Sequence, residues 1–197
     1  MARTVRTKVY KFNELSGPAK ETARQSWREH GLDYEWHEFT IEGLKERAPE
    51  KGFEIDKIYF SGFCCQGDGA MFEGSVVDFS KFLNGTNPHF QKVVKNNGLD
   101  LSWSVRHSGH YYHSRCSQIS FDAGNYPYTY SSKEGFTGNF QTNIDIMESN
   151  IEEAYHDYCH EIYSTLEKEY DWLNSDEQVD ESIIANEYEF TKDGRRF

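Results

Sequence analysis

The sequence contains no long apolar run, and only 37% of its 197 residues are hydrophobic. No stretch approaches the roughly 20 apolar residues that cross a bilayer, and the N-terminal residues MARTVRTKVYKF lack the apolar segment of a secretion signal. We therefore expect no membrane partner and a cytoplasmic location. The chain also lacks the cysteine spacing of a disulfide framework, so reduced thiols are expected. The four cysteines are Cys64, Cys65, Cys116 and Cys159.

Sequence signatures of the common enzyme classes are also missing. The chain contains no GxSxG nucleophile motif, no Walker A loop and no dinucleotide-binding fingerprint. His156 and His160 have the spacing of a zinc motif, but Asp157 stands where HExxH has its glutamate. We therefore expect no catalytic residue, no cofactor and no metal site, and an enzyme is the less favoured class.

Aromatic residues, in contrast, make up 16% of the chain, with 14 Phe, 13 Tyr and 4 Trp. A core of this composition must consist largely of rings rather than aliphatic side chains. Because domains cluster near roughly 100 to 150 residues, we expect a single domain over residues 1–197.

Periodicity predicts both strands and helices in the first two thirds of the chain. The clearest strand is 99–106, where apolar and polar residues alternate. Further strands are predicted at 5–12, 53–63, 70–79 and 111–121, and helices at 18–30, 34–48 and 88–95. The residues QGDG form the predicted turn between the second and third of these strands, and 125–143 is expected to be a long loop.

A long amphipathic helix is predicted from Ile144 onward, and Ser175 is expected to cap a shorter helix over 176–186. Together they form an acidic helical segment, 144–187. With two hairpins and no βαβ alternation, we expect an α+β fold, in which the long helix covers one face of an antiparallel sheet of about four to five strands. The apolar positions of the long helix are Ile144, Met147, Ile151, Tyr155, Tyr158, Ile162, Leu166 and Leu173.

Negative charge is concentrated in the C-terminal third. The net charge is -12, and 145–189 holds fifteen acidic residues against the single base Lys168. A field of one sign repels DNA and attracts basic partners, so we expect this face to bind a basic protein or nucleoprotein complex and not DNA directly. A merely solvated helix face is the alternative. The predicted partner-binding residues are Glu148, Glu152, Glu153, Asp157, Glu161, Asp176, Glu177, Asp180 and Glu181.

Two polar clusters suggest a second kind of site. The first is SGFCCQGDGAMFEG, residues 61–74, and the second is RHSGHYYHSR, residues 106–115. Asp-Gly between two strands is typical of a tight turn, and the rings of the second cluster are consistent with simple cross-strand pairing. If the two turns meet at one end of the sheet, they form a pocket. The candidate pocket residues are Gln66, Asp68, Glu73, His107 and His113.

Four segments carry a resemblance to a known family: YKFNEL, IYFSGFCCQGDGAMFEG, HSGHYYH and DESIIANEYEFTKDGRR. With them the chain resembles phage and prophage proteins labelled "antitoxin of toxin-antitoxin stability system", and it departs from that family in its middle segment. The resemblance implies an accessory protein of mobile genetic elements that acts in the cytoplasm of a bacterial host. Small acidic proteins of this origin commonly block CRISPR complexes or restriction enzymes.

Three functions follow as hypotheses. The first is an acidic anti-defence inhibitor of anti-CRISPR or anti-restriction type, whose carboxylates mimic nucleic acid. The second is a protein that binds a nucleotide or another small ligand, or a hydrolase, with its pocket at the two turns. The third is an antitoxin that neutralises a cognate toxin. The sequence does not indicate an oligomeric state.

Overall fold

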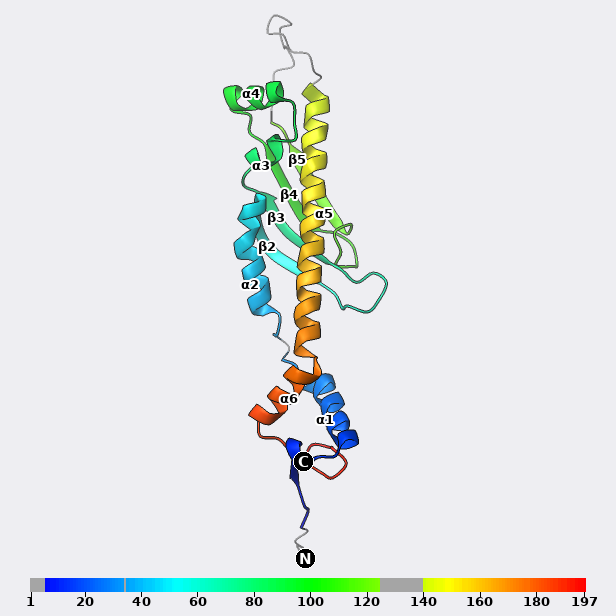
Figure 1. Cartoon of the computed structure of the whole chain (residues 1–197). Coiled ribbons are helices and arrows are strands. Elements are labelled where there is room, and N and C mark those ends of the chain that lie inside the picture. Colours follow the sequence, from blue (N-terminus) through cyan, green and yellow to red (C-terminus); the bar gives the residue numbers. More distant parts are fainter. Residues whose placement is uncertain (1–5, 34, 125–139) are drawn as a thin grey trace, which may run out of the picture. The chain divides into compact units, whose positions relative to one another are not determined.

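The computed structural model describes residues 6–33, 35–124 and 140–197 (Figure 1). The chain divides into two compact units, each with its own internal contacts. Unit 1 comprises the described parts of Met1–Glu38 together with Glu167–Phe197, and unit 2 comprises those of Phe39–Leu166. A single domain over residues 1–197 stays a prediction, and each unit is described by itself.

Unit 2 is built on a four-stranded antiparallel sheet in the order β2-β3-β4-β5. The predicted α+β class is confirmed, as is the antiparallel sheet. A bulge in β2 separates the pairs Ile55↔Gly74 and Lys57↔Glu73. The strands are β2 (Phe53–Phe60), β3 (Ala70–Val76), β4 (Ser102–His107) and β5 (Ser117–Asp122).

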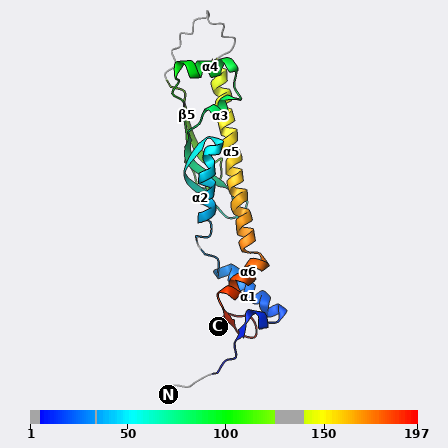
Figure 2. The ribbon, with the colours of Figure 1, turned by 60° about the vertical axis from the view of Figure 1, so that its left-hand side comes forward.

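The long helix α5 (Phe140–Leu173) packs against this sheet, as Figures 1 and 2 show from two sides. The ring of Tyr155 contacts Phe72 at 4.9 Å and Trp103 at 5.6 Å between centroids. Tyr158 also contacts Phe72, and its hydroxyl donates to the carbonyl of Leu44 at 2.5 Å. All the predicted apolar positions of α5 are buried except Leu173. The prediction that rings outnumber aliphatic side chains in the core is wrong, since 9 of the 31 buried hydrophobic residues that the structure describes are aromatic, although rings make the contacts between α5 and the sheet.

Shorter helices complete unit 2. Asn87 caps α4 by accepting a hydrogen bond from the backbone N–H of His89, and Pro88 occupies the first turn. None of the described helices is both long and apolar enough to cross a membrane. These elements are α2 (Glu38–Arg47), a 3₁₀ helix (Ala48–Lys51), α3 (Ser80–Leu83) and α4 (Pro88–Asn97).

Unit 1 pairs residues from the two ends of the chain. Its core contains Phe12, Leu15, Ala19, Ala23, Val179, Ile183 and Phe190. Ser175 caps α6 as predicted, accepting from the backbone N–H of Gln178 at 3.4 Å. The elements are β1 (Tyr10–Lys11), a 3₁₀ helix (Phe12–Glu14), α1 (Gly17–His30), α6 (Asp176–Ala185) and β6 (Glu189–Phe190), with β1 antiparallel to β6.

Several predicted boundaries are wrong. The first strand is only Tyr10–Lys11 among its described residues, because Phe12 turns into a 3₁₀ helix and the unit 1 core. The QGDG turn is a longer loop over 61–69, and β5 begins at Ser117 instead of Tyr111. Most of the predicted long loop, residues 125–139, lies outside the described residues, and the remainder opens α5.

Gly74 tests the pairing of β2 with β3. A Cβ at this position would overlap the carbonyl oxygen of Glu54, whereas Gly43 in α2 has no atom within 4 Å of its Cβ position. We expect Gly74→Ala to lower the free energy of unfolding by about 1–3 kcal/mol through backbone overlap. Gly43→Ala should raise it by about 0.5–1 kcal/mol, because alanine favours a helix. Urea unfolding measures both, and equal effects would contradict the described register.

Candidate functional site

The loop 61–69 is held closed by its own polar groups. Ser61 and Gly69 exchange two hydrogen bonds across its base, at 3.0 and 3.1 Å. One carboxylate oxygen of Asp68 accepts the backbone N–H groups of Cys64 and Cys65, at 3.0 and 2.7 Å. The N–H of Cys65 is the largest cause of the lowered pKa of Asp68. Asp68 is therefore an ionised clamp on the two cysteines.

The loop 108–116 turns back on itself in a similar way. The backbone N–H of Ser108 donates to the carbonyl of Cys116 at 3.0 Å, and the N–H of Cys116 donates to that of His113 at 2.8 Å. Gly109 has a φ of 102°, a left-handed conformation that favours glycine. The loop thereby exposes Tyr111 and Tyr112 to solvent.

The two loops meet at one end of the sheet (Figure 1). A Cβ on Gly69 would lie 2.6 Å from the Cβ of His113, so glycine permits the close approach of the two backbones. Next to this contact, Tyr59 of β2 stacks on both His107 and Tyr112, with centroids 5.1 and 5.3 Å apart. The condition that the two turns meet is therefore fulfilled, whereas a ligand pocket between them stays a prediction.

Glu73 of β3 joins the residues beneath the loops. Its two carboxylate oxygens accept the backbone N–H of His107 at 2.9 Å and the hydroxyl of Tyr59 at 3.2 Å. The pKa of Glu73 is lowered, chiefly by the His107 N–H, and partial burial opposes this shift. Glu73 is thus an ionised, half-buried tie between strands β2, β3 and β4.

The predicted pocket residues have different positions in the structure. Glu73 and His107 are in direct contact, and His113 touches the first loop through Gly69. Asp68 binds only within its own loop, and Gln66 is exposed without a hydrogen bond to any described residue. The sequence analysis missed Tyr59 and Tyr112. Their only sequence signal was a tyrosine near each glycine-containing turn, Tyr59 close to the end of β2 and Tyr112 within the loop 108–116.

His113 and Cys116 form a histidine–cysteine contact, with Nε2 and Sγ 3.5 Å apart. The backbone N–H of Arg115 donates to Nδ1 of the same ring at 3.2 Å. A neutral imidazole whose Nδ1 accepts a hydrogen bond carries its proton on Nε2. The ring then donates toward the sulfur and cannot take the thiol proton. This pair is therefore not arranged as a nucleophile with its general base.

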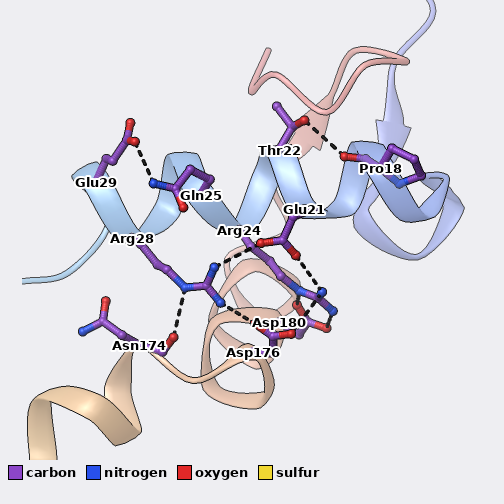
Figure 3. A network of polar contacts seen from close by, with 10 residues as sticks. All are labelled: Pro18, Glu21, Thr22, Arg24, Gln25, Arg28, Glu29, Asn174, Asp176 and Asp180. Atoms are coloured by element: carbon purple, nitrogen blue, oxygen red, sulfur yellow. Dashed lines mark hydrogen bonds and ion pairs between the residues drawn. The ribbon is translucent and has the colours of Figure 1, made fainter.

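Two of the four acidic residues of α6 form ion pairs within unit 1 (Figure 3). Asp180 makes a bidentate ion pair with Arg24, with both N···O distances 2.7 Å. Asp176 pairs with Arg28 and with Arg24, and Glu21 completes the network. The hydrogen bonding that Arg24 donates to Asp180 is the largest cause of the raised pKa of Arg24, so this cation stays charged. Of the four predicted α6 residues, Glu177 and Glu181 make no ion pair with a described residue.

The predicted acidic residues of α5 belong to unit 2 and are mostly unneutralised. Glu161 pairs with Lys51 at 3.1 Å. The other four, Glu148, Glu152, Glu153 and Asp157, make no ion pair with any described residue. Burial and repulsion from Glu152 and Asp145 raise the pKa of Glu148, so these three carboxylates lie near one another. Six of the nine predicted residues thus make no ion pair with a described residue, four on α5 and two on α6. That they bind a partner stays a prediction.

Two hollows in unit 1 are weaker candidates for a ligand-binding site than the two loops of unit 2. Their volumes are about 110 and 280 Å³, below the roughly 300–1,000 Å³ of ligand pockets. Apolar surface dominates both linings, which include Trp27, Ile183, Tyr188 and Phe190 in the smaller hollow. We therefore place the candidate site at the two loops of unit 2.

Glu73→Gln tests the tie beneath the loops. The folded-state pKa of Glu73 lies below its usual 4.5, so the carboxylate stabilises the fold above that pH and loses this effect as pH falls through the lowered pKa. At pH 7 we expect the variant to be less stable than the wild type by about 1–3 kcal/mol, and this difference to shrink as the pH falls from 4.5 through the lowered pKa. Thermal unfolding across this range measures both. Glu54→Gln, on the exposed surface of β2, is the control, and a difference independent of pH would contradict the assignment.

Comparison with known proteins gives one match. Residues 36–176, which include both loops and all of α5, match the family described as Domain of unknown function (DUF8835). No curated protein and no solved structure matches the chain. The resemblance to phage proteins labelled as antitoxins, and the antitoxin function with it, stay predictions. Because the match covers more than half of its residues, this chain belongs to the DUF8835 family.

Proposed function

We propose that this protein binds a small planar ligand, a nucleotide in the first instance, on the surface formed by the loops 61–69 and 108–116. The observation that carries the proposal is that these loops, distant in sequence, meet and expose rings over an ordered polar base. The pair His113 and Cys116 is not arranged as a general base and a nucleophile, so the proposal is binding rather than hydrolysis by this pair. We further propose that the protein acts in the cytoplasm of a bacterial host.

The exposed rings supply the affinity for a nucleobase. Tyr111 is 57% exposed and Tyr112 38% exposed, although large aromatic side chains are usually covered. Stacking of a nucleobase on an aromatic side chain contributes about 1–3 kcal/mol. Tyr112 already stacks on Tyr59 on one side, which orients its ring. A second planar group on this stack would extend an existing geometry.

Cations near the rings suit a phosphate-bearing ligand. Lys57 Nζ lies 4.3 Å from the centroid of the Tyr59 ring, and Arg115 is exposed on the second loop. Arg115 makes no ion pair with a described residue, and Arg106 makes one at 3.5 Å with the exposed Asp56. An exposed pair of this kind contributes little to stability, so a phosphate can compete for Arg106. The rings and cations together match the two halves of a nucleotide.

The hydrogen-bonded residues beneath the exposed rings lower the entropic cost of binding. The clamp of Asp68 in the first loop and the tie of Glu73 to His107 hold the loops before any ligand arrives. Groups that are already fixed need not be immobilised on binding, which preserves more of the interaction energy as affinity.

Tyr111→Ala tests the proposal, with Phe39→Ala as its matched control. Phe39 is another ring of unit 2, on α2, and is 88% exposed. A panel of purine and pyrimidine nucleotides should raise the melting temperature of the wild type, with a stabilisation of about 2.7 kcal/mol at 100 times the Kd. We expect Tyr111→Ala to weaken binding by about 5- to 150-fold and Phe39→Ala to leave it unchanged. A flat panel, or equal losses in both variants, would reject the site.

A second candidate function is the acidic anti-defence inhibitor, restricted to the carboxylates of α5. Burial first, and then repulsion from Glu152 and Asp145, raises the pKa of Glu148, and a cationic partner would relieve the repulsive part. The α6 residues Asp176 and Asp180 do not contribute, since arginines of α1 already hold them. The partner is then a basic protein or nucleoprotein complex of the bacterial host.

Charge neutralisation on the two helices tests this second function. We expect the wild type to retain a basic protein from bacterial lysate at low salt and to release it at high salt. The α5 variant E152Q/E153Q/D157N should retain about tenfold less, since each exposed charge contributes roughly 0.2–1 kcal/mol. The α6 variant E177Q/E181Q is the control with matched acids. Equal retention by all three proteins would count against an α5 binding face.

A further inference from the structure

We propose that Cys64, Cys65 and Asp68 form a binding site for a thiophilic divalent cation such as zinc or cadmium. Each offers one ligand atom, and these three atoms lie within 4.8 Å of one another, the one such His/Cys/Asp/Glu group among the described residues. No metal site was expected from the sequence, because Asp157 stands where the zinc motif HExxH has its glutamate. The inference goes beyond nucleotide binding and rests on other residues than the exposed tyrosines.

The separation of the two sulfurs fits a shared tetrahedral ion. The Sγ atoms of Cys64 and Cys65 are 3.7 Å apart, and both cysteines are free thiols. Two thiolates at the usual zinc–sulfur distance of about 2.3 Å and a tetrahedral angle lie about 3.8 Å from each other. The two sulfurs therefore need little movement to ligate one ion.

The backbone of the loop produces this arrangement. Successive side chains in an extended strand point to opposite faces, which would separate the sulfurs of neighbouring cysteines. Here the carboxylate of Asp68 accepts the backbone N–H groups of both cysteines and bends the chain around itself. One oxygen, Oδ2, accepts both bonds, and a carboxylate oxygen of Asp68 lies within 4.8 Å of both sulfurs. Asp68 thus shapes the site and supplies its hard ligand.

The exposure of the group determines what kind of site it is. Cys64 and Cys65 are exposed and Asp68 is half-buried, so an ion reaches them from solvent without a structural change. Three protein ligands leave the fourth tetrahedral position to water or to another molecule, as in zinc sites that exchange ligands rather than in closed structural ones. Thiolate ligands select zinc and cadmium over magnesium and calcium, which prefer oxygen.

Cadmium titration tests the site, because cadmium thiolates have an ultraviolet charge-transfer band that reports sulfur ligation directly. The full chain, reduced and free of nucleotide, is titrated against a competing chelator. We expect one cadmium per chain with this band, loss of the band in C64S/C65S, and at least about tenfold weaker binding in D68N. Circular dichroism of each variant confirms that it is folded.

The remaining cysteines provide matched controls. Cys116 is half-buried in the other loop and Cys159 is buried in α5. Cys116→Ser and Cys159→Ala should keep both the band and the stoichiometry. Absence of a band in the wild type, its persistence in C64S/C65S, or equal weakening by Cys116→Ser would overturn the proposal. A failed nucleotide screen would not affect it, since no nucleotide is present in the titration.

Discussion

Ring packing between α5 and the four-stranded sheet is the interaction on which unit 2 depends. Tyr155 contacts Phe72 of β3 and Trp103 of β4, so a single side chain of the helix holds two neighbouring strands. Aromatic pairs of this kind add about 0.5–1.5 kcal/mol each beyond the burial of their area. Because the strands are fixed in this way, their ends are fixed as well, and loops 61–69 and 108–116 leave the sheet as neighbours. The candidate site is therefore a consequence of the core.

The parts of this fold that were predictable from sequence are those with a local period. Alternation around Trp103 and Val105 marked β4, and the 3.6-residue spacing from Ile144 marked α5. The true register was not predictable, since Val105 lies opposite Ile119 only because the intervening loop closes between Ser108 and Cys116. The meeting of the two turns was stated only as a condition. Gly69 and His113 are 44 residues apart, and no local pattern encodes such a contact.

Net charge predicted the acidic surface less well than periodicity predicted the helices and strands, because partners distant in sequence also decide which charges are paired. Counting the acidic residues between 145 and 189 gives a correct total charge. The count treats all of these carboxylates as one source of negative potential, although some are paired with arginines and others are not. Arg24 and Arg28 lie about 150 residues before Asp176 and Asp180 in sequence, yet they hold these carboxylates at hydrogen-bonding distance (Figure 3). Charges paired in this way contribute little to the field at a distance. Only the described residues without such partners, among them residues of α5 and Glu177 and Glu181 of α6, retain the character that the sequence suggested for the whole segment.

The two proposed binding chemistries in unit 2 are physically separable, although their loops touch. Asp68 directs its hydrogen bonds into the first loop, toward Cys64 and Cys65, whereas Glu73 directs its bonds toward His107 and Tyr59. Among the described residues, no hydrogen bond connects the contacts of Asp68 with those of Glu73. The contact between the loops is the van der Waals approach of Gly69 to His113, which transmits position without carrying charge. Sulfur ligation in one loop and ring stacking in the other therefore depend on a common scaffold, and each can be altered by substitution while the other stays in place.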